Sequence, residues 1–354
     1  MDIAGLTVAV TPTSCLENQS MQFRALGNSE LKISVIGLGT WAIGGGNWKF
    51  GWGDQDESEA IETIVKSVEV GVNWIDTAAI YGLGRSEQMV GKALRLIPAD
   101  SRPIIATKCG RTNIGRGDIG KCLLRDSIIA ECEASLQRLN IDCIDLYQMH
   151  WPEPDDQIEE GWHTLVDLKA QGKVQHIGVS NHSVAQMQRL QAIHPITSLQ
   201  PAYSMIARNI EPELLPFCGH ENIGVLCYSP MGKGLLTGTF TAERVAALPA
   251  KDHRTRDPRF QSPQLEVNLA FVKELAAVSE GLGWTLPELS IAWVLRQPEV
   301  TAAIVGARRP DQIVQTAAAG TRGMAADSIM AVESALQRRD EALAALGHIE
   351  QPKV

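Results

Sequence analysis

What this 354-residue sequence lacks already removes several classes of protein. No stretch reaches the roughly 18 consecutive apolar residues that suggest a membrane-spanning helix. The first 20 residues have neither the positively charged start nor the apolar run of a signal peptide. We therefore expect no contact with a membrane and no secretion.

Basic charge and paired cysteines are also scarce. The chain has 32 Lys and Arg against 41 Asp and Glu, a net charge of −9, which argues against binding to the phosphates of nucleic acid. Its seven cysteines form no C-x-x-C pair, so a disulfide framework or a structural zinc site is disfavoured. These features are typical of a cytoplasmic protein.

The beginning of the chain differs from the rest. Residues 1–20 show no hydrophobic periodicity, and we interpret them as a flexible leader ahead of one domain, residues 21–354. Residues 23–33 contain the polar turn Gly27-Asn28-Ser29 between two short alternating runs, which predicts a β-hairpin.

From residue 35 onward, short β-rich apolar runs alternate with amphipathic helical stretches. Strands are expected at residues 35–38, 74–77, 104–107, 144–147, 177–179, 198–202, 225–228 and 302–305. Helices are expected at residues 57–70, 86–96, 123–139, 158–170, 184–193, 212–220, 265–280 and 311–319. Eight such units predict an α/β fold of the closed (β/α)8 TIM-barrel type. A long insert, residues 235–262, follows the seventh strand, and an extra C-terminal helix is expected at residues 325–346.

One motif suggests a different fold. Gly37-Leu38-Gly39-Thr40-Trp41-Ala42 matches the G-x-G-x-x-A pattern of dinucleotide-binding sheets. That pattern needs a helix that begins directly after the glycines. The next helix here is expected only near Glu57, so we reject this interpretation.

Polar residues stand at the ends of successive predicted strands. Asp76, Lys108 and His150 each end or follow one strand, and Tyr81 lies shortly after Asp76. Taken singly, each has an ordinary structural explanation, such as a cap, a solvated lysine, a satisfied histidine or a packing aromatic. In a barrel, however, the carboxyl ends of all strands meet at one face, where catalytic groups gather.

The sequence resembles the aldo-keto reductases over about residues 22–320. The matching segments are Gly37-Leu38-Gly39-Thr40-Trp41, Asp76-Thr77-Ala78-Ala79-Ile80-Tyr81-Gly82, Gly84-x-Ser86-Glu87, Ala106-Thr107-Lys108-Cys109-Gly110, Asp145-Leu146-Tyr147-Gln148-x-His150-Trp151-Pro152, Ile177-Gly178-Val179-Ser180-Asn181, Tyr228-Ser229-Pro230-Met231 and Ile304-Val305-Gly306-Ala307-Arg308. They occur in the family's order and at its spacing.

The resemblance implies a catalytic tetrad of Asp76, Tyr81, Lys108 and His150 and reversible, NADPH-dependent reduction of aldehydes or ketones. Tyr81 would be the general acid. Free tyrosine has a pKa near 10, and we expect the Lys108 cation to lower that pKa, with Asp76 holding the ammonium group in place. His150 would orient the carbonyl oxygen of the substrate.

The resemblance also implies a set of cofactor contacts and no metal. These residues are Gly39, Thr40, Trp41, Asp76, Ser180, Asn181, Gln200, Tyr228, Ser229, Pro230, Met231, Lys233, Gly234, Gly306, Ala307, Arg308 and Gln312. Ser180, Asn181 and Gln200 would bind the carboxamide, and Tyr228 would stack under the nicotinamide. Arg308 and Arg309 form a cationic fork suited to the 2′-phosphate of NADPH. The family usually has Glu-Asn where this chain has Gln315-Thr316, so the adenine contacts depart from its pattern.

Two other functions compete with the enzyme. One is a non-catalytic, nicotinamide-binding redox sensor on the same fold, which the tetrad alone does not exclude. The other is a metal-dependent barrel hydrolase, which would need a clustered motif such as His-x-His that the sequence does not contain. The small-molecule carbonyl substrate and the oligomeric state are not specified by the sequence.

Overall fold

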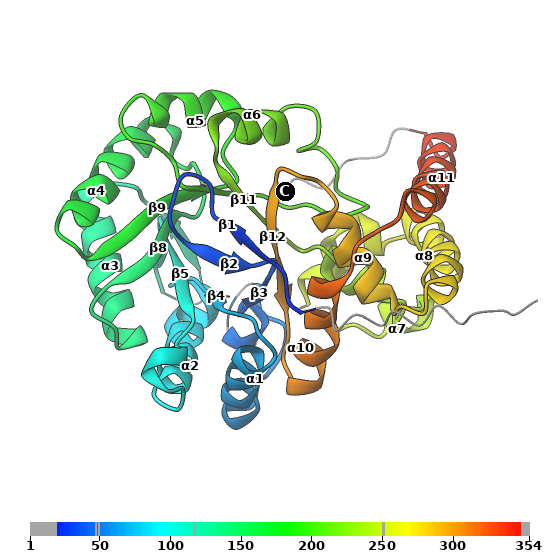
Figure 1. Cartoon of the computed structure of the whole chain (residues 1–354), viewed down its shortest axis with the longest axis horizontal. Helices are drawn as coiled ribbons and strands as arrows, with labels where there is room; N and C mark the ends of the chain where they lie inside the picture. The colour runs from blue at the N-terminus through cyan, green and yellow to red at the C-terminus, as the bar shows by residue number, and fades with distance from the viewer. Residues whose placement is uncertain (1–19, 47, 49, 116–117, 250–251, 348–354) are drawn as a thin grey trace, which may run out of the picture.

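The apolar runs form one closed sheet in the computed structural model, which describes residues 20–46, 48, 50–115, 118–249 and 252–347 (Figure 1). Within these ranges, eight parallel strands pair in the order β10-β11-β12-β3-β4-β5-β8-β9 and close on themselves. Their bounds are β3 Ile36–Gly39, β4 Trp74–Asp76, β5 Ile104–Cys109, β8 Ile144–Met149, β9 Val174–Ser180, β10 Ser198–Gln200, β11 Gly224–Tyr228 and β12 Val300–Gly306. The predicted (β/α)8 barrel is confirmed.

Helices surround the barrel, and one of them corrects the sequence analysis. The described helices are α1 Glu57–Glu69, α2 Arg85–Leu94, α3 Arg125–Leu139, α4 Ile158–Ala170, α5 Val184–Gln191, α6 Leu214–Glu221, α7 Ala242–Ala246, α8 Gln264–Gly281, α9 Leu286–Leu295, α10 Pro310–Ala317 and α11 Ala326–Ala345. Residues 265–280 were expected to form the seventh barrel helix, but it is α9 that packs on β12, whereas α8 lies further out (Figure 1). All of α9 apart from Leu286 is buried, so it has no polar face and no amphipathic pattern.

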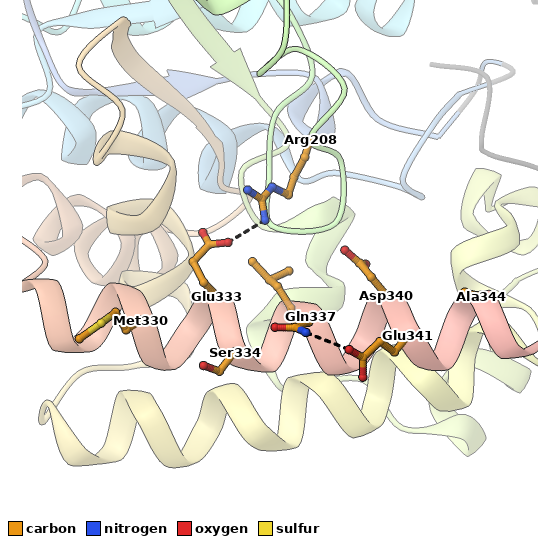
Figure 2. A pocket seen from close by; sticks show the side chains of 9 residues that line it. Arg208, Met330, Glu333, Ser334, Gln337, Asp340, Glu341 and Ala344 are labelled. Carbon is orange, nitrogen blue, oxygen red and sulfur yellow. Dashed lines mark hydrogen bonds and ion pairs between the residues drawn. The ribbon is translucent and has the colours of Figure 1, made fainter.

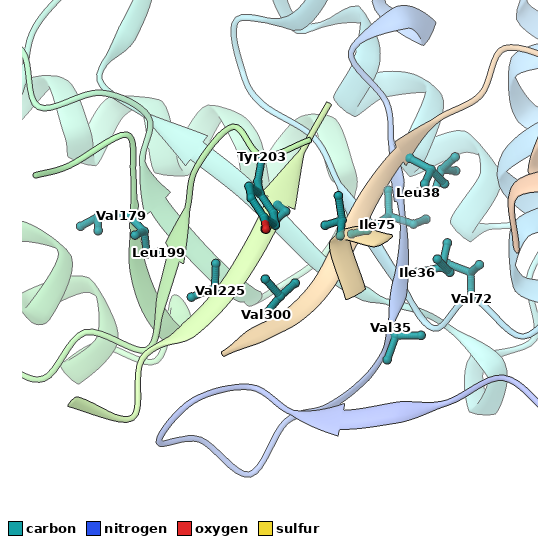
Figure 3. Close-up of a cluster of buried hydrophobic side chains, with 14 of the residues drawn as sticks. Val35, Ile36, Leu38, Val72, Ile75, Val179, Leu199, Tyr203, Val225 and Val300 are labelled. Atoms are coloured by element: carbon teal, nitrogen blue, oxygen red, sulfur yellow. The ribbon is translucent and has the colours of Figure 1, made fainter. Parts of the chain in front are cut away.

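The core has an inner and an outer layer, because alternate residues of a strand point to opposite faces. Trp74, Ala106, Leu146, Leu226 and Ala302 belong to one buried cluster, each from a different barrel strand. A larger cluster includes Ile75, Leu199 and Val225 of the barrel strands (Figure 3). Residues of the surrounding helices belong to the same cluster.

The predicted N-terminal hairpin is present and caps one end of the barrel. Strands β1 (Phe23–Ala25) and β2 (Lys32–Ser34) pair antiparallel. Leu26 and Ile33 of this hairpin join the inner cluster. A second hairpin that the sequence analysis did not predict, β6 (Arg111–Asn113) with β7 (Ile119–Lys121), follows β5.

The extra C-terminal helix is also confirmed and packs on α8 at the outside of the barrel (Figure 1). Glu333 of α11 forms ion pairs with Arg208 at 2.9 Å and with Arg296 at 3.0 Å. Both guanidinium groups lie over the ring of Trp293 in α9. Figure 2 shows Arg208 reaching Glu333 across a surface cavity beside α11, where none of the predicted site residues lies.

Two further expectations concern segments outside regular structure. The predicted leader, residues 1–20, lies outside the described residues except for Ser20. The described parts of the insert, residues 235–262, form short helical turns and the five-residue helix α7. Across the described ranges, no helix is both long enough and apolar enough to span a membrane.

Candidate active site

Four predicted catalytic residues meet at the carboxyl ends of three neighbouring strands. Asp76 ends β4, Lys108 lies near the end of β5, and His150 directly follows β8. Trp74, Ala106 and Leu146 of the same three strands face inward. Asp76 and Lys108 each lie two positions after the inward-facing residue of their strand, and His150 lies four positions after Leu146. The two-residue period therefore directs all three side chains into the barrel. Tyr81 begins the short turn η2, Tyr81–Gly84, that follows β4.

Asp76 and Lys108 form a buried ion pair below this site. Lys108 Nζ donates to both carboxylate oxygens of Asp76 at 2.7 and 2.8 Å and to the Thr77 carbonyl oxygen at 2.8 Å. Gln200 Nε2 donates to Asp76 Oδ2 at 2.7 Å. All three side chains are almost inaccessible to solvent, so the ammonium group is held in one position by directed hydrogen bonds.

The hydroxyl group of Tyr81 lies 3.5 Å from Lys108 Nζ. The Tyr81 ring packs edge-on against the ring of His150, with 5.7 Å between the centroids. A phenol, a cation and an imidazole thus face the same space, which suits proton transfer to an oxygen atom bound between them.

The pKa of Tyr81 is raised in this structure, not lowered as the sequence analysis expected. Burial, with the Asp76 carboxylate as the second cause, raises the pKa of Tyr81 well above its usual value. Asp76 lies against Lys108, and the negative charge of its carboxylate disfavours the tyrosinate form of Tyr81. Burial also lowers the pKa of Lys108, against the opposing effect of Asp76. Tyr81 is therefore a protonated donor at neutral pH.

His150 is neutral at physiological pH. Burial, followed by the charges of Lys108 and Arg111, lowers its pKa well below the ordinary value. Its Nδ1 atom is buried and has no hydrogen-bond partner among the described residues. A neutral imidazole has one N–H to donate, which fits hydrogen bonding to an uncharged carbonyl oxygen.

A second group of predicted residues extends the site along β9, β10 and β11. Asn181 Nδ2 donates to the His150 carbonyl oxygen at 3.2 Å, and the Tyr228 hydroxyl donates to Asn181 Oδ1 at 2.9 Å. Ser180 Oγ donates to the Gln200 carbonyl oxygen at 2.7 Å. These side chains hold one another in place beside the tetrad, and Asn181 has the left-handed φ of 61°.

The segment after β11 bends sharply toward the insert. Ser229 and Lys233 have φ angles of 55° and 58°, and Gly234 has 94°. Lys233 Nζ pairs with Asp257 of the insert at 3.0 Å, and Asp257 also binds Arg259 at 2.6 Å. The predicted Pro230 and Met231 line the cavity between these groups and the tetrad.

The two arginines predicted to bind the adenosine part of the cofactor, Arg308 and Arg309, differ in their contacts. Arg308 donates to Gln55 Oε1 at 2.7 Å, to the Trp52 carbonyl oxygen at 2.9 Å and to the Asp54 carbonyl oxygen. Arg309 is half-exposed, and among the described residues its guanidinium pairs with its neighbour Asp311 alone, at 3.2 Å. Arg308 therefore already ties the end of β12 to the loop before α1, whereas Arg309 faces solvent.

One cavity of about 2150 Å³ joins the tetrad to these groups. Its wall includes 15 of the 17 predicted cofactor residues: Gly39, Trp41, Asp76, Ser180, Asn181, Gln200, Tyr228, Ser229, Pro230, Met231, Lys233, Gly234, Gly306, Arg308 and Gln312. Thr40 and Ala307 do not line it. Thr40 is buried and donates from Oγ1 to the Asp76 carbonyl oxygen at 3.0 Å, and Ala307 packs in the outer core.

The sequence analysis missed two parts of this wall. The β6–β7 hairpin contributes Arg111, which pairs with Glu153 at 2.6 Å, and Ile119. The glycine-rich sequence between its two strands was a usable signal for a turn. His253 of the insert also lines the cavity, packed against Trp41, but no periodicity marked it. Within the described residues, no group of three or more His, Cys, Asp and Glu side chains could hold a metal ion.

Comparison with known proteins places these features in context. The family model "Aldo/keto reductase family" matches residues 35–337. Aldo-keto reductase YhdN of Bacillus subtilis is 38% identical over 294 residues, covering 83% of this chain and 87% of that protein. The NADH-specific methylglyoxal reductase of Escherichia coli is 35% identical over 307 residues, covering 83% of this chain and 92% of that protein.

Solved structures agree with the sequence comparison. The glycerol dehydrogenase AKR11B4 of Gluconobacter oxydans superposes with a TM-score of 0.81 at 32% identity, covering 95% of this chain and 98% of that one. The aldo-keto reductase AKR11C1 of Bacillus halodurans gives a TM-score of 0.73 at 26% identity, covering 89% and 96% of the two chains.

Proposed function

Because this chain belongs to the aldo/keto reductase family and is an NAD(P)H-dependent oxidoreductase acting on carbonyl groups, we propose that it reduces aldehydes or ketones to alcohols with Tyr81 as the general acid. The observation that carries this proposal is the arrangement of the Tyr81 hydroxyl 3.5 Å from the buried ammonium group of Lys108. An oxygen atom bound at this position would meet both the proton of Tyr81 and the positive charge of Lys108.

The residues of the chain would act on the carbonyl oxygen of the substrate. His150, neutral, donates a hydrogen bond that orients this oxygen beside Tyr81. As negative charge develops on the oxygen, Tyr81 transfers its phenolic proton to it. Lys108, fixed by Asp76 and Gln200, stabilises the tyrosinate that remains. A high pKa of Tyr81 keeps the proton in place until a base as strong as an alkoxide forms.

The cavity fits a nicotinamide cofactor, which supplies the hydride when bound. At Gly306 an added Cβ would have no heavy atom within 4 Å, so a ligand can approach this backbone closely. Lys233 and Arg259 gather positive charge near the bend after β11, where a pyrophosphate would be stabilised. Ser180, Asn181 and Tyr228 would hold the nicotinamide end.

We further propose that the cofactor is NADPH. Arg309 is exposed in the wall of the cavity and, within the described part of the chain, pairs with Asp311 alone, so its guanidinium can bind the 2′-phosphate. Arg308 supports that position through its bonds to Gln55 and Trp52. The NADH-specific relative from Escherichia coli makes cofactor choice a question for experiment.

The cytoplasm is the compartment that best suits this activity. Cys109, Cys122, Cys132, Cys143, Cys218 and Cys227 are all free thiols, as a reducing compartment permits. Fractionation of the source cells tests this location: activity should appear with cytoplasmic markers.

A turnover assay tests the proposed reaction. NADPH consumption, followed by absorbance, should accelerate when members of a broad panel of aldehydes and ketones are added. Binding of NADPH without reduction of any compound in the panel would instead favour the non-catalytic redox sensor.

A further inference from the structure

Three ring nitrogens without partners lie together in the wall of the catalytic cavity. Both ring nitrogens of His253 and Nε1 of Trp52 are buried, and none has a hydrogen-bond partner among the described residues. The two rings touch edge to face, with 4.8 Å between their centroids. Buried polar groups in folded proteins are nearly always hydrogen-bonded, so a set of three unpaired atoms indicates that a ligand completes them.

The position of His253 connects these nitrogens with the reaction. Its ring packs on Trp41 with 5.1 Å between the centroids. Trp41 in turn stacks against Tyr81 at 6.4 Å with an interplanar angle of 25°. All four side chains line the same cavity. A molecule that presents its carbonyl group to Tyr81 therefore extends past Trp41 toward His253.

The charge state of His253 limits what it can bind. Burial, followed by the nearby Lys233 cation, lowers its pKa to about 4, so the imidazole is neutral at physiological pH. One ring nitrogen then donates a hydrogen bond and the other accepts one, while Trp52 only donates. These two donors and one acceptor suit an uncharged oxygen atom of a ligand, above all that of a hydroxyl group, which both donates and accepts hydrogen bonds.

We propose that His253, with Trp52 beside it, is a specificity-determining residue that binds a second oxygen of the substrate, so that the enzyme prefers carbonyl compounds with a hydroxyl group close to the reacting carbonyl. This inference rests on the proposed carbonyl reduction and adds the class of substrate. Since the nitrogens are closed off from water, the imidazole turns about its Cα–Cβ bond when substrate binds. Side-chain rearrangements of this kind are common on binding.

Matched substrate pairs test the proposal. kcat/KM is measured with NADPH for acetone against hydroxyacetone and for propanal against 2-hydroxypropanal. His253→Phe keeps the aromatic contacts with Trp41 and removes both nitrogens, while His253→Gln keeps one donor and one acceptor. His220→Phe is the matched control, because His220 is exposed on α6.

The ratio of hydroxylated to plain substrate is the readout. We expect it to fall about tenfold or more in His253→Phe, as is typical when a site loses a hydrogen-bonding partner for the substrate. His253→Gln should keep most of the preference and His220→Phe all of it. kcat/KM for the plain substrates is measured in every variant as the internal reference, so a loss common to both substrates leaves the ratio unchanged.

Several outcomes would overturn the proposal. A ratio that is unchanged in folded His253→Phe, checked by its melting temperature, contradicts it. So does a change confined to the KM for NADPH, which would make His253 a cofactor contact. If His253→Phe does not fold, an unchanged ratio in Trp52→Phe decides against the proposal. Failure of the wild type to reduce any compound would instead refute the proposed function.

Discussion

The two sides of the cavity are built in different ways. On the strand side, Asp76, Lys108 and Gln200 are buried and satisfy one another through direct hydrogen bonds. On the side of the insert, short turns are held by local ion pairs, such as Asp257 with Arg259, and His253 is left unpaired. The barrel thus fixes the proposed catalytic groups, and a segment outside the barrel carries His253, the proposed specificity-determining residue.

The largest effect should come from the strand side. Tyr81→Phe removes only the phenolic hydroxyl, so the packing against His150 and Trp41 and the binding of cofactor should remain. Turnover should fall by roughly 10²–10⁴-fold, the usual cost of losing a general acid. Steady-state kinetics together with cofactor titration by tryptophan fluorescence check this. Near-normal carbonyl reduction would show that another group donates the proton.

A smaller effect is expected where the adenosine would lie. Replacing Arg308 and Arg309 with Ala should raise the KM for NADPH about ten- to a hundredfold relative to that for NADH, because a charge-assisted contact with phosphate is lost. Arg309→Ala alone should account for most of this change, since Arg308 is already bonded within the protein. An equal effect on both cofactors would contradict the assignment.

A still smaller effect is expected from Asp257→Asn, which should weaken the structure of the insert and leave that of the barrel unchanged. Burial would raise the pKa of Asp257, but the hydrogen bond and charge of Arg259, with Lys233, hold that pKa below its usual value. The stabilisation is therefore present above the ordinary pKa of aspartate, near 3.9, and is lost as the pH falls below it. Asp257→Asn should raise the KM for cofactor several-fold at pH 7.

Amide hydrogen exchange measures the local stability of the insert and of the barrel strands separately. Faster exchange of residues 252–262 in Asp257→Asn, with unchanged protection of the barrel strands, is the expected result. The wild type should show this opening only under acidic conditions. Equal loss of protection in strands and insert would mean that the two sides form one cooperative unit.

The smallest effect is expected at the N-terminus. Gln22 forms the first described backbone hydrogen bonds that anchor the chain, donating to the Gly320 carbonyl oxygen at 3.1 Å and accepting from Val35. Deleting residues 1–20 should therefore leave activity unchanged and the melting temperature within a few degrees. A larger shift in thermal unfolding would show that this segment contributes to the stability of the barrel.

The barrel strands and the placement of the tetrad could be predicted from the sequence because both depend on local pattern. A short, β-rich apolar run marks a strand, and the parallel order then brings Asp76, Lys108 and His150 to one face. α9 could not be recognised by periodicity, since a helix buried almost all round lacks a polar face. The pKa of Tyr81 depends on burial, and the unpaired state of His253 on contacts with Trp41 and Trp52, which only the folded chain reveals.

The pairing of β12 with β3 closes the barrel and sets the order of events during synthesis. β3 is the first of the barrel strands to leave the ribosome, yet one of its two neighbours, β12, is the last of them to be made. Until residue 306 has emerged, β3 and β11 each keep an open edge, the kind of surface on which strands of other chains can pair. We therefore expect the nascent barrel to complete its sheet only near the end of translation.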